Sequence, residues 1–342
     1  MKTPLLLTFV LLASPLSAEE KRHELSARAS EIDPRAKAHP EIGFVFEKDG
    51  KPQDVQHASV DTRVPSQGKL VIWLMGYNRE LFEHLTGYGL HAVQVHYANG
   101  WFGKLYSGEP PRDDLFLSKI RLEAATGEDA SRAVKIPLPD SIMERSYQFV
   151  KWLDREDPSG GWKQFLTRDG KGLLWEKVIL SGISHGATTA GRMAKAVKVD
   201  RVVMFSGPRD QFETWQSLPS ATAGNRFFGF THTLDGGWTG DHYRRSWQLM
   251  EMQRYGPIVN VGGGPAPYQN SRRLITDADV KGDAERAHNC VIPGSSAVRD
   301  ASGNYLHENV WRYLFTHPVE QAGQPVPADR GVWMDQRSKR PD

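Results

Sequence analysis

The chain has 342 residues, 39% of them hydrophobic, and its 43 basic residues nearly balance its 41 acidic ones. A near-neutral chain has no strong field that would attract nucleic acid or an acidic surface, so we expect no nucleic-acid partner. Because Cys290 is the single cysteine, an internal disulfide framework is excluded and a packed core must stabilise the fold.

The first 18 residues have the layout of a secretory signal peptide. One cation, Lys2, precedes an apolar run from Leu5 to Leu12, and small residues follow up to Ala18. This run is too short to span a bilayer, and no later segment is long and apolar enough to do so. We expect an exported protein, secreted or periplasmic, without stable membrane insertion; a membrane-tethered N-terminus is the alternative.

The next segment, 19–40, is charged and rich in alanine, and it predicts a short helix or a loose arm. Residues 43–60 predict two strands around a turn at Asp49-Gly50. Residues 100–139 form a long insertion that we expect to pack over the site as a cap or wall. The chain is therefore divided into the signal peptide (1–18), the arm (19–40), one domain (41–318) and a C-terminal tail (319–342).

From residue 69 onward, short apolar runs alternate with helical segments. Continuous apolar runs of this length are typical of strands buried on both faces, as in a parallel sheet. Strands that alternate with helices predict an α/β fold with a mostly parallel, doubly wound sheet flanked by helices. The predicted strands are 69–76, 91–99, 177–182, 200–207, 226–232 and 272–279, and the predicted helices are 140–153, 185–198 and 242–255.

Residues 182–186, Gly-Ile-Ser-His-Gly, place Ser184 between two glycines, directly after a predicted strand and before a small-residue helix. This strand–turn–helix setting is the one that a nucleophile elbow requires. Cβ atoms two positions before or after the serine would collide with the neighbouring strand and helix. The turn also places the hydroxyl at the positive end of a helix. We predict Ser184 as a nucleophile; a structural turn, or a phosphate-binding loop without the P-loop lysine, is the alternative.

A serine hydroxyl is a weak nucleophile at neutral pH and needs a base and an orienting acid. In this topology the acid and then the histidine follow the serine along the chain. His185 is adjacent to Ser184 and would point away from the hydroxyl, so we interpret its backbone N–H as an oxyanion donor. The histidines after the serine are His185, His232, His242, His288, His307 and His317.

The chain resembles the α/β-hydrolases over about residues 43–316, and most closely a bacterial group of exported serine hydrolases. The stretches that carry the resemblance are "GISHGA", "RVVMFSGPRD", "HTLD", "RAHNCV" and "NVWRYLF". The first is specific to the superfamily, and the later ones are specific to the group. The resemblance implies Ser184 as nucleophile, Asp235 as acid and His288 as base.

Reasoning from the residues alone leaves other assignments open. Asp210 follows the strand before the Asp235 loop, where some hydrolases keep their acid, and Asp241 is a third candidate. His307 immediately precedes the last predicted helix and satisfies the same loop logic as His288. His232, beside the acid loop, is more typical of a wall or hydrogen-bonding residue than of the base.

An oxyanion hole needs two backbone donors. Besides the N–H of His185, we expect the second at Gly76 or Tyr77, in the loop after the first long strand. Glycine there lets the backbone approach the substrate closely. The loop lacks the histidine-glycine pair or glycine run that is common in lipases. Candidate walls for an apolar or aromatic acyl group are Tyr77, Trp101, Phe102 and Trp238.

These features predict an exported serine hydrolase that cleaves a small-molecule carboxylic ester through a Ser-His-Asp triad and an acyl-enzyme. The alternative is a catalytically inactive binding protein with the α/β-hydrolase fold. We expect no cofactor and no metal, because the histidines lack metal-ligand spacing and no CxxC pair exists. A Cys290–His288 nucleophilic pair is a further alternative. The substrate's acyl and alcohol parts and the oligomeric state are not indicated by the sequence.

Overall fold

The computed structural model describes residues 20–105, 113–210 and 214–329, so the predicted signal peptide lies outside it. Its centre is a nine-stranded sheet in the order β1-β4-β6-β5-β7-β8-β9-β11-β10, and a two-stranded hairpin, β2-β3, lies apart. The strands are β1 (Arg22–Arg28), β2 (Glu47–Lys48), β3 (Lys51–Pro52), β4 (Val55–Asp61), β5 (Leu70–Trp73), β6 (His91–Gln94), β7 (Val178–Ile183), β8 (Arg201–Phe205), β9 (Phe227–His232), β10 (Ile258–Asn260) and β11 (Arg273–Thr276).

Seven neighbouring strands, from β6 to β10 in the sheet order, pair in parallel, whereas β1–β4 and β4–β6 are antiparallel. Every residue of β5, β6, β7 and β8 is buried, which agrees with their mostly apolar sequences and with helices on both faces of the sheet. This arrangement is the α/β-hydrolase fold, and the fold class predicted from the sequence is confirmed.

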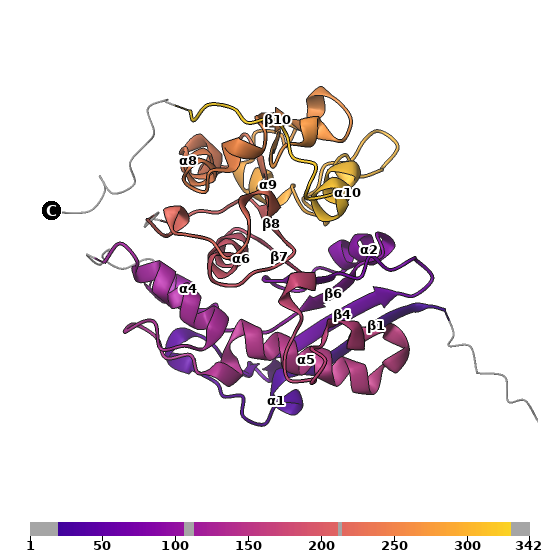
Figure 1. Ribbon diagram of the computed structural model, residues 1–342, viewed down its shortest axis with the longest axis vertical. Helices are drawn as coiled ribbons and strands as arrows, with labels where there is room; N and C mark the ends of the chain where they lie inside the picture. Colours follow the sequence, from indigo (N-terminus) through magenta and orange to yellow (C-terminus); the bar gives the residue numbers. More distant parts are fainter. Residues whose placement is uncertain (1–19, 106–112, 211–213, 330–342) are drawn as a thin grey trace, which may run out of the picture.

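Helices cover both faces of the sheet and enclose two separate apolar cores. Phe149 of α5, Met193 of α6 and Trp247 of α8 are fully buried on one face, and Phe82 of α2 and Trp311 of α10 on the other. In Figure 1, α6 and α8 accordingly lie to the left of β7 and β8, and α2 and α10 to the right. The helices are α1 (Ala29–Ile32), α2 (Arg79–Gly87), α3 (Trp101–Leu105), α4 (Phe116–Thr126), α5 (Ile142–Glu156), α6 (His185–Ala196), α7 (Gly236–Thr239), α8 (His242–Leu249), α9 (Ala284–Asn289) and α10 (Glu308–Thr316).

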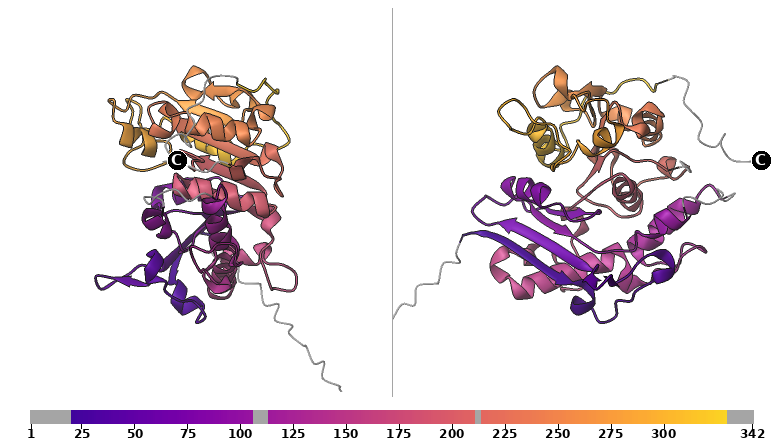
Figure 2. Two further views of the ribbon diagram at one scale, coloured as in Figure 1. Left: turned by 90° about the vertical axis from the view of Figure 1, so that its left-hand side faces the viewer. Right: turned by 180° about the vertical axis from the view of Figure 1, so that it is seen from behind.

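The segment expected to be a short helix or a loose arm contains the short helix α1, but it begins with strand β1, which the expectation missed. The strand pairs along its whole length with β4, from Arg22 opposite Asp61 to Arg28 opposite Val55. The two antiparallel strands form the indigo edge of the sheet in Figure 2. The sequence of β1, RHELSAR, is mostly polar because an edge strand has little surface to bury. For this reason β1 was not recognised as a strand from its sequence.

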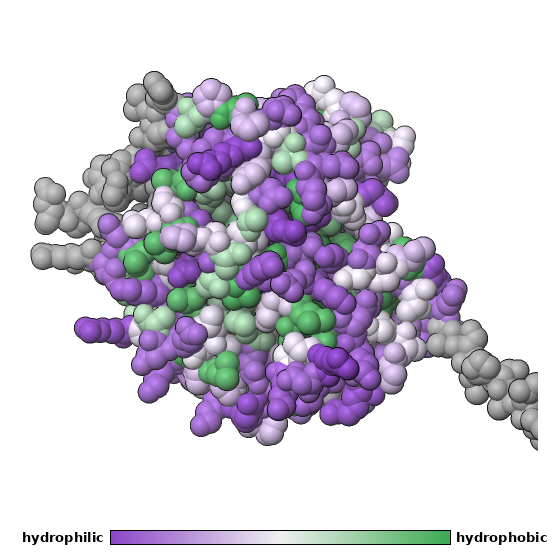
Figure 3. Space-filling view, viewed as in Figure 1, coloured by the Kyte–Doolittle hydropathy of each residue, from purple (hydrophilic) through white to green (hydrophobic). Residues whose placement is uncertain are grey.

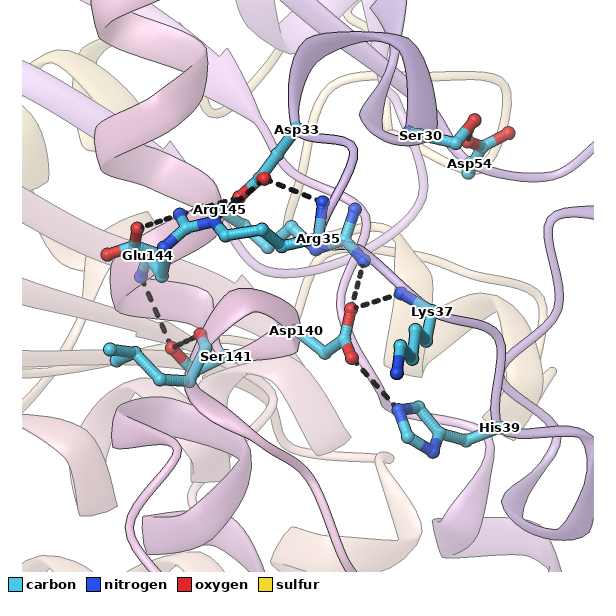
Figure 4. Close-up of polar contacts among 11 residues, drawn as sticks. Ser30, Asp33, Arg35, Lys37, His39, Asp54, Asp140, Ser141, Glu144 and Arg145 are labelled. Atoms are coloured by element: carbon cyan, nitrogen blue, oxygen red, sulfur yellow. Dashed lines mark hydrogen bonds and ion pairs between the residues drawn. The ribbon is translucent and has the colours of Figure 1, made fainter.

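A dense ionic cluster docks the rest of this segment onto the start of α5 (Figure 4). The buried carboxylate of Asp140 accepts hydrogen bonds from the Lys37 N–H at 3.0 Å, His39 Nε2 at 2.9 Å and Arg145 Nη2 at 2.7 Å. Arg35 pairs with Asp33 at 2.8 Å on the same side. Breaking one partner of a buried pair leaves the other charge uncompensated, so this cluster fixes the segment against the domain.

The hairpin expected around Asp49-Gly50 is present but small. Both residues have positive φ, 51° and 70°, as a two-residue hairpin turn requires, and β2 pairs with β3. The second strand expected there continues past the hairpin as β4 and joins the main sheet.

The described part of the insertion lies beside the helix that follows β7. Helix α4 packs against α6 and α5, and the insertion shares a third apolar cluster with the segment around Phe44, including Ile42, Trp101 and Ile120. On the face shown in Figure 3, hydrophobic residues gather in a band across the middle of the molecule, at the level of α4 and α6. The described part of the insertion therefore lies against α6, the helix that follows β7.

The described part of the C-terminal tail is held by backbone hydrogen bonds. Gly323 N–H donates to Asn270 O at 2.8 Å, and Val326 N–H donates to Gln253 O at 3.0 Å. Among the helices of the described residues, none has both the length and the apolar character needed to cross a bilayer.

Candidate active site

Ser184 lies on a strained turn between β7 and α6. Its backbone angles, φ 55° and ψ −117°, fall in a region that L-residues rarely adopt. A Cβ on Gly182 would lie 2.5 Å from the backbone carbon of Gly186, and a Cβ on Gly186 would lie 2.2 Å from the Leu74 oxygen. The two glycines are therefore required by close packing, for the reason inferred from the sequence.

The turn is fixed from both sides. The Ser184 N–H donates to Phe205 O at 3.0 Å, at the end of β8, and the Thr188 hydroxyl donates to Ser184 O at 3.0 Å. Ser184 is the residue before the first turn of α6, a 12-residue helix, so its side chain lies at the end where backbone N–H groups are unpaired.

Asp235 and His288, which are 53 positions apart in the sequence, are hydrogen-bonded in the structure. The distance from His288 Nδ1 to Asp235 Oδ2 is 2.7 Å. Asp235 is 2% exposed and caps α7, where its Oδ1 accepts from the Gly237 N–H at 2.7 Å and from the Tyr243 hydroxyl at 3.1 Å. Because an ionised carboxylate only accepts, Nδ1 carries the proton and Nε2 of a neutral His288 is left as an acceptor.

The Asp235 carboxyl remains charged despite its burial. Burial alone would raise its pKa, but the hydrogen bond from His288, with the one from the Gly237 N–H, outweighs that effect and lowers the pKa. A charged acceptor at this position favours the tautomer of His288 that can take a proton at Nε2.

The end of β8 links the serine turn to the histidine. Phe205 O accepts from the Ser184 N–H, and the next residue, Ser206, donates its hydroxyl to His288 O at 2.8 Å. Among the hydrogen bonds of the described residues, none joins the Ser184 hydroxyl to His288. Such bonds are often long before a substrate is bound. Ser206 has a positive φ of 43° and was not identified from the sequence, where nothing distinguishes it from other serines that follow a strand.

The other candidate base, His307, is 1% exposed and is held in the core. Its Nε2 is 3.0 Å from the Thr276 hydroxyl, and its ring packs edge-on against Phe230 and Trp311. Burial lowers its pKa to about 4, so it remains neutral in the core. His232 is also structural: its ring nitrogens bond to the Leu234 N–H at 2.9 Å and to Ala278 O at 2.7 Å.

The two other candidate acids have different partners. Asp210 is fully buried in a forked ion pair with Arg121, with N–O distances of 2.7 and 2.9 Å. Asp241 precedes α8 in the left-handed conformation and pairs with Arg244. Among the described residues, the contacts of these carboxylates do not include His288.

The loop after β5 approaches the elbow through its first peptide. Leu74 O and the Met75 side chain are the groups against which Gly186 packs, which places the 74–75 peptide beside the start of α6. Gly76 lies one position further and accepts from Trp73 Nε1 at 2.9 Å. The Tyr77 ring turns away to stack on His57, with ring centroids 4.0 Å apart. Met75 therefore joins Gly76 and Tyr77 as a candidate donor; the sequence pattern favoured glycine and missed it.

A cavity of about 430 Å³ opens beside this loop. Its lining includes Ile183, the residue before Ser184, and Ile292 and Gly294, in the loop after His288. The cavity therefore adjoins the candidate site at the carboxyl ends of the strands. A second cavity of about 430 Å³ lies at the opposite ends of the strands, where Lys69 and Arg226 pair with Asp200. The residues that line the first cavity are Trp73, Met75, Gly76, Tyr77, Asn78, Arg79, Glu80, Ile183, Ile292 and Gly294.

The aromatic residues expected as walls have separate positions. The rings of Trp101 and Phe102 lie beside His185, at centroid distances of 5.1 and 4.5 Å. Trp238 packs against Trp247 at 5.8 Å, on the core side of α8. Of the expected walls, Trp101 and Phe102 are the ones that contact the residue after the serine.

Cys290 is fully buried, and its thiol donates to Ala287 O at 3.4 Å. Burial raises its pKa to about 12, which leaves the thiolate, the reactive form, unpopulated. No group of three or more histidine, cysteine or acidic side chains within the described ranges is arranged to hold a metal ion.

No protein-family model and no curated protein matches the sequence. Solved structures with similar folds include a protein named as a dienelactone hydrolase from Klebsiella pneumoniae subsp. pneumoniae MGH 78578, with 10% identity, a TM-score of 0.36, and coverage of 85% of this chain and 95% of that one. Fungal esterases from Rhizomucor miehei give 12% identity, a TM-score of 0.37, and coverage of 86% and 83%. An α/β serine hydrolase without a lid from Xanthomonas campestris has 10% identity and a TM-score of 0.33, and the match covers 77% of this chain and 92% of that one. Similarities of this size define neither a family nor a substrate.

Proposed function

We propose that this protein is a serine hydrolase that cleaves a carboxylic ester, with Ser184 as nucleophile, His288 as base and Asp235 as acid. The observation that carries the proposal is the 2.7 Å bond between His288 and the buried Asp235, at the same edge of the sheet as the strained Ser184 turn. A buried carboxylate behind a half-exposed histidine is the arrangement that activates a serine hydroxyl.

The reaction follows from these positions. The Ser184 oxygen attacks the ester carbonyl carbon while its proton passes to His288 Nε2. Asp235 stabilises the resulting imidazolium, and the tetrahedral intermediate collapses as His288 returns the proton to the departing alcohol. Water then attacks the acyl-enzyme with His288 again taking the proton. Release of the carboxylic acid restores the Ser184 hydroxyl.

The negative charge of the tetrahedral intermediate needs preorganised donors. The backbone N–H of His185, at the start of α6, is the first of them. The second comes from the loop after β5, where the 74–75 peptide packs against Gly186 and favours the Met75 N–H, with Gly76 and Tyr77 as alternatives. The adjoining cavity of about 430 Å³ is large enough for a small substrate.

A serine-directed fluorophosphonate probe and a panel of p-nitrophenyl esters test this function. We expect labelling and turnover by the wild type, and neither by Ser184→Ala. A folded wild type that is not labelled and hydrolyses no ester would refute the proposal. It would favour the alternative, a binding protein that keeps the fold without turnover.

We also propose that the protein is exported and that residues 1–18 are removed. The support is the layout of that segment, with Lys2 before an apolar run and small residues up to Ala18. N-terminal sequencing of the protein from a secretion-competent host tests this. A mature chain that still begins at Met1 and remains in the cytoplasm would contradict it.

A further inference from the structure

The side chain of His185 is held by an arginine from the insertion. Arg121, on α4, places its Nη1 3.1 Å from His185 Nδ1, 3.3 Å from His185 O and 2.8 Å from the Thr189 hydroxyl. A guanidinium only donates hydrogen bonds, so His185 Nδ1 is the acceptor. A neutral imidazole that accepts at Nδ1 carries its proton on Nε2.

Asp210 fixes the orientation of that arginine. Its two oxygens accept from Arg121 Nη2 at 2.7 Å and Nε at 2.9 Å, and both side chains are fully buried. Asp210 is itself held by Trp215 Nε1 at 3.0 Å. A planar fork bound in this way cannot rotate without losing both bonds, so the position of Nη1 beside His185 is set by the insertion and by the loop after β8.

The proton on His185 Nε2 has no hydrogen-bond partner among the described residues, although the atom is buried. Buried donors are rarely left unpaired, because they lose their bonds to water and gain nothing in return. The rings of Trp101 and Phe102 are beside it, but an aromatic face is only a weak acceptor. Burial, with the nearby Arg121 charge, holds the pKa of His185 well below its usual range, so the ring stays a neutral, single donor.

We propose that His185 is a specificity-determining residue, whose Nε2–H binds an acceptor oxygen on the acyl part of the substrate while Arg121 and Asp210 hold the ring in that tautomer. This inference rests on the proposed function, because it requires an acyl group bonded to Ser184, the residue next to His185 in the chain. Esters of oxygen-bearing acids, such as alkoxy, hydroxy or keto acids, are then preferred over esters of simple alkanoic acids of the same length.

Two nearly isosteric substrates test this preference, p-nitrophenyl methoxyacetate and p-nitrophenyl butanoate. The ratio of their kcat/KM values is measured in the wild type, His185→Phe and His185→Gln, because comparison between enzymes cancels the intrinsic reactivity of the esters. We expect the ratio to fall about tenfold in His185→Phe, which has no donor. His185→Gln keeps an N–H at the Nε2 position and should restore most of the ratio.

The arginines supply a matched control. Arg121→Lys removes the fork that orients His185 and should also lower the ratio, whereas Arg145→Lys disturbs a buried pair with Asp140, at 2.7 Å, that belongs to the docking cluster of Figure 4. The ratio should not change in Arg145→Lys.

Equal ratios in the wild type and His185→Phe would overturn the inference and leave the hydrolase function standing, since both esters would still be turned over. If His185→Phe does not fold, Arg121→Lys and Arg145→Lys are compared instead, and equal ratios in these two variants would overturn the inference. A wild type that neither hydrolyses the esters nor reacts with the fluorophosphonate would overturn the proposed function and this inference together.

Discussion

Replacing Asp235 by asparagine tests the role of the acid with little change of shape. Asp235 Oδ1 accepts from the Gly237 N–H at 2.7 Å, and a backbone N–H cannot reverse its polarity. The amide oxygen of asparagine must therefore stay on the Gly237 side, and its NH₂ group must face His288 Nδ1. That forces Nδ1 to accept and puts the proton of His288 on Nε2, where it blocks proton transfer from Ser184.

The expected loss follows from this change of tautomer. In Ser-His-Asp triads the same substitution lowers kcat roughly 10⁴-fold, which corresponds to about 5.5 kcal/mol of transition-state free energy. The assay is steady-state hydrolysis of p-nitrophenyl butanoate, with the rate of fluorophosphonate labelling of Ser184 as a second readout. Circular dichroism and thermal unfolding should show that Asp235→Asn is folded.

Two other aspartates serve as comparisons. Asp241→Asn should keep wild-type activity, because asparagine tolerates the left-handed conformation at that position. Asp210→Asn weakens the pair with Arg121 and should act mainly on stability and on the acyl preference. If folded Asp235→Asn kept activity within tenfold of the wild type, Asp235 would not be the acid and the proposed triad would be refuted.

Three further outcomes are expected. Arg121→Gln and Arg145→Gln each remove the guanidinium that compensates a buried carboxylate, Asp210 or Asp140, and should each lower the free energy of unfolding by about 3–5 kcal/mol in urea titrations. Arg121→Gln alone should also change ester kinetics, and similar kinetics in both variants would contradict the role of Arg121. Gly186→Ala puts a Cβ 2.2 Å from the Leu74 oxygen and should abolish folding or activity, so an active, stable variant would refute the elbow geometry. The pKa of His307 is lowered to about 4 in the folded state. Its contribution to the free energy of unfolding, about 3 kcal/mol, is therefore complete above the pKa of the unfolded state and is lost as pH falls towards 4. Between about pH 6.5 and about pH 4.5, the free energy of unfolding should therefore fall less in His307→Gln than in the wild type. An equal fall in the two proteins would refute this prediction.

The features that could be predicted from the sequence are those with a local pattern. The buried strands show as apolar runs, and the serine turn shows as five consecutive residues whose glycines are forced by packing. Asp235 and His288 are less local, but both follow strands whose carboxyl ends meet at one edge of the sheet, so the order of elements in the chain limits the choice. His307 satisfied the same order; burial of its ring and its bond to Thr276 instead of an acid, which both depend on tertiary packing, separate it from His288.

The features that could not be predicted depend on contacts between distant residues. Arg121 and Asp210 are 89 positions apart. Arg121 looks like an ordinary surface charge in the sequence, and Asp210 is there only a candidate acid, not the partner of an arginine. Strand β1 has a polar sequence because it covers an edge, and its assignment depends on its pairing with β4. Met75 is identified only from the packing of the 74–75 peptide on Gly186, because a backbone donor leaves no trace in the identity of its side chain.

The end of β8 carries both the peptide that holds the serine turn and the hydroxyl that holds the histidine loop. A displacement of that strand end would move the two anchored groups in the same direction, so their separation changes less than the position of either one. Substitutions in the distant core then shift the Ser184 turn and the His288 loop together, in the same direction. Such a coupling would let core substitutions accumulate during evolution while the separation of the Ser184 turn and the His288 loop stays nearly constant.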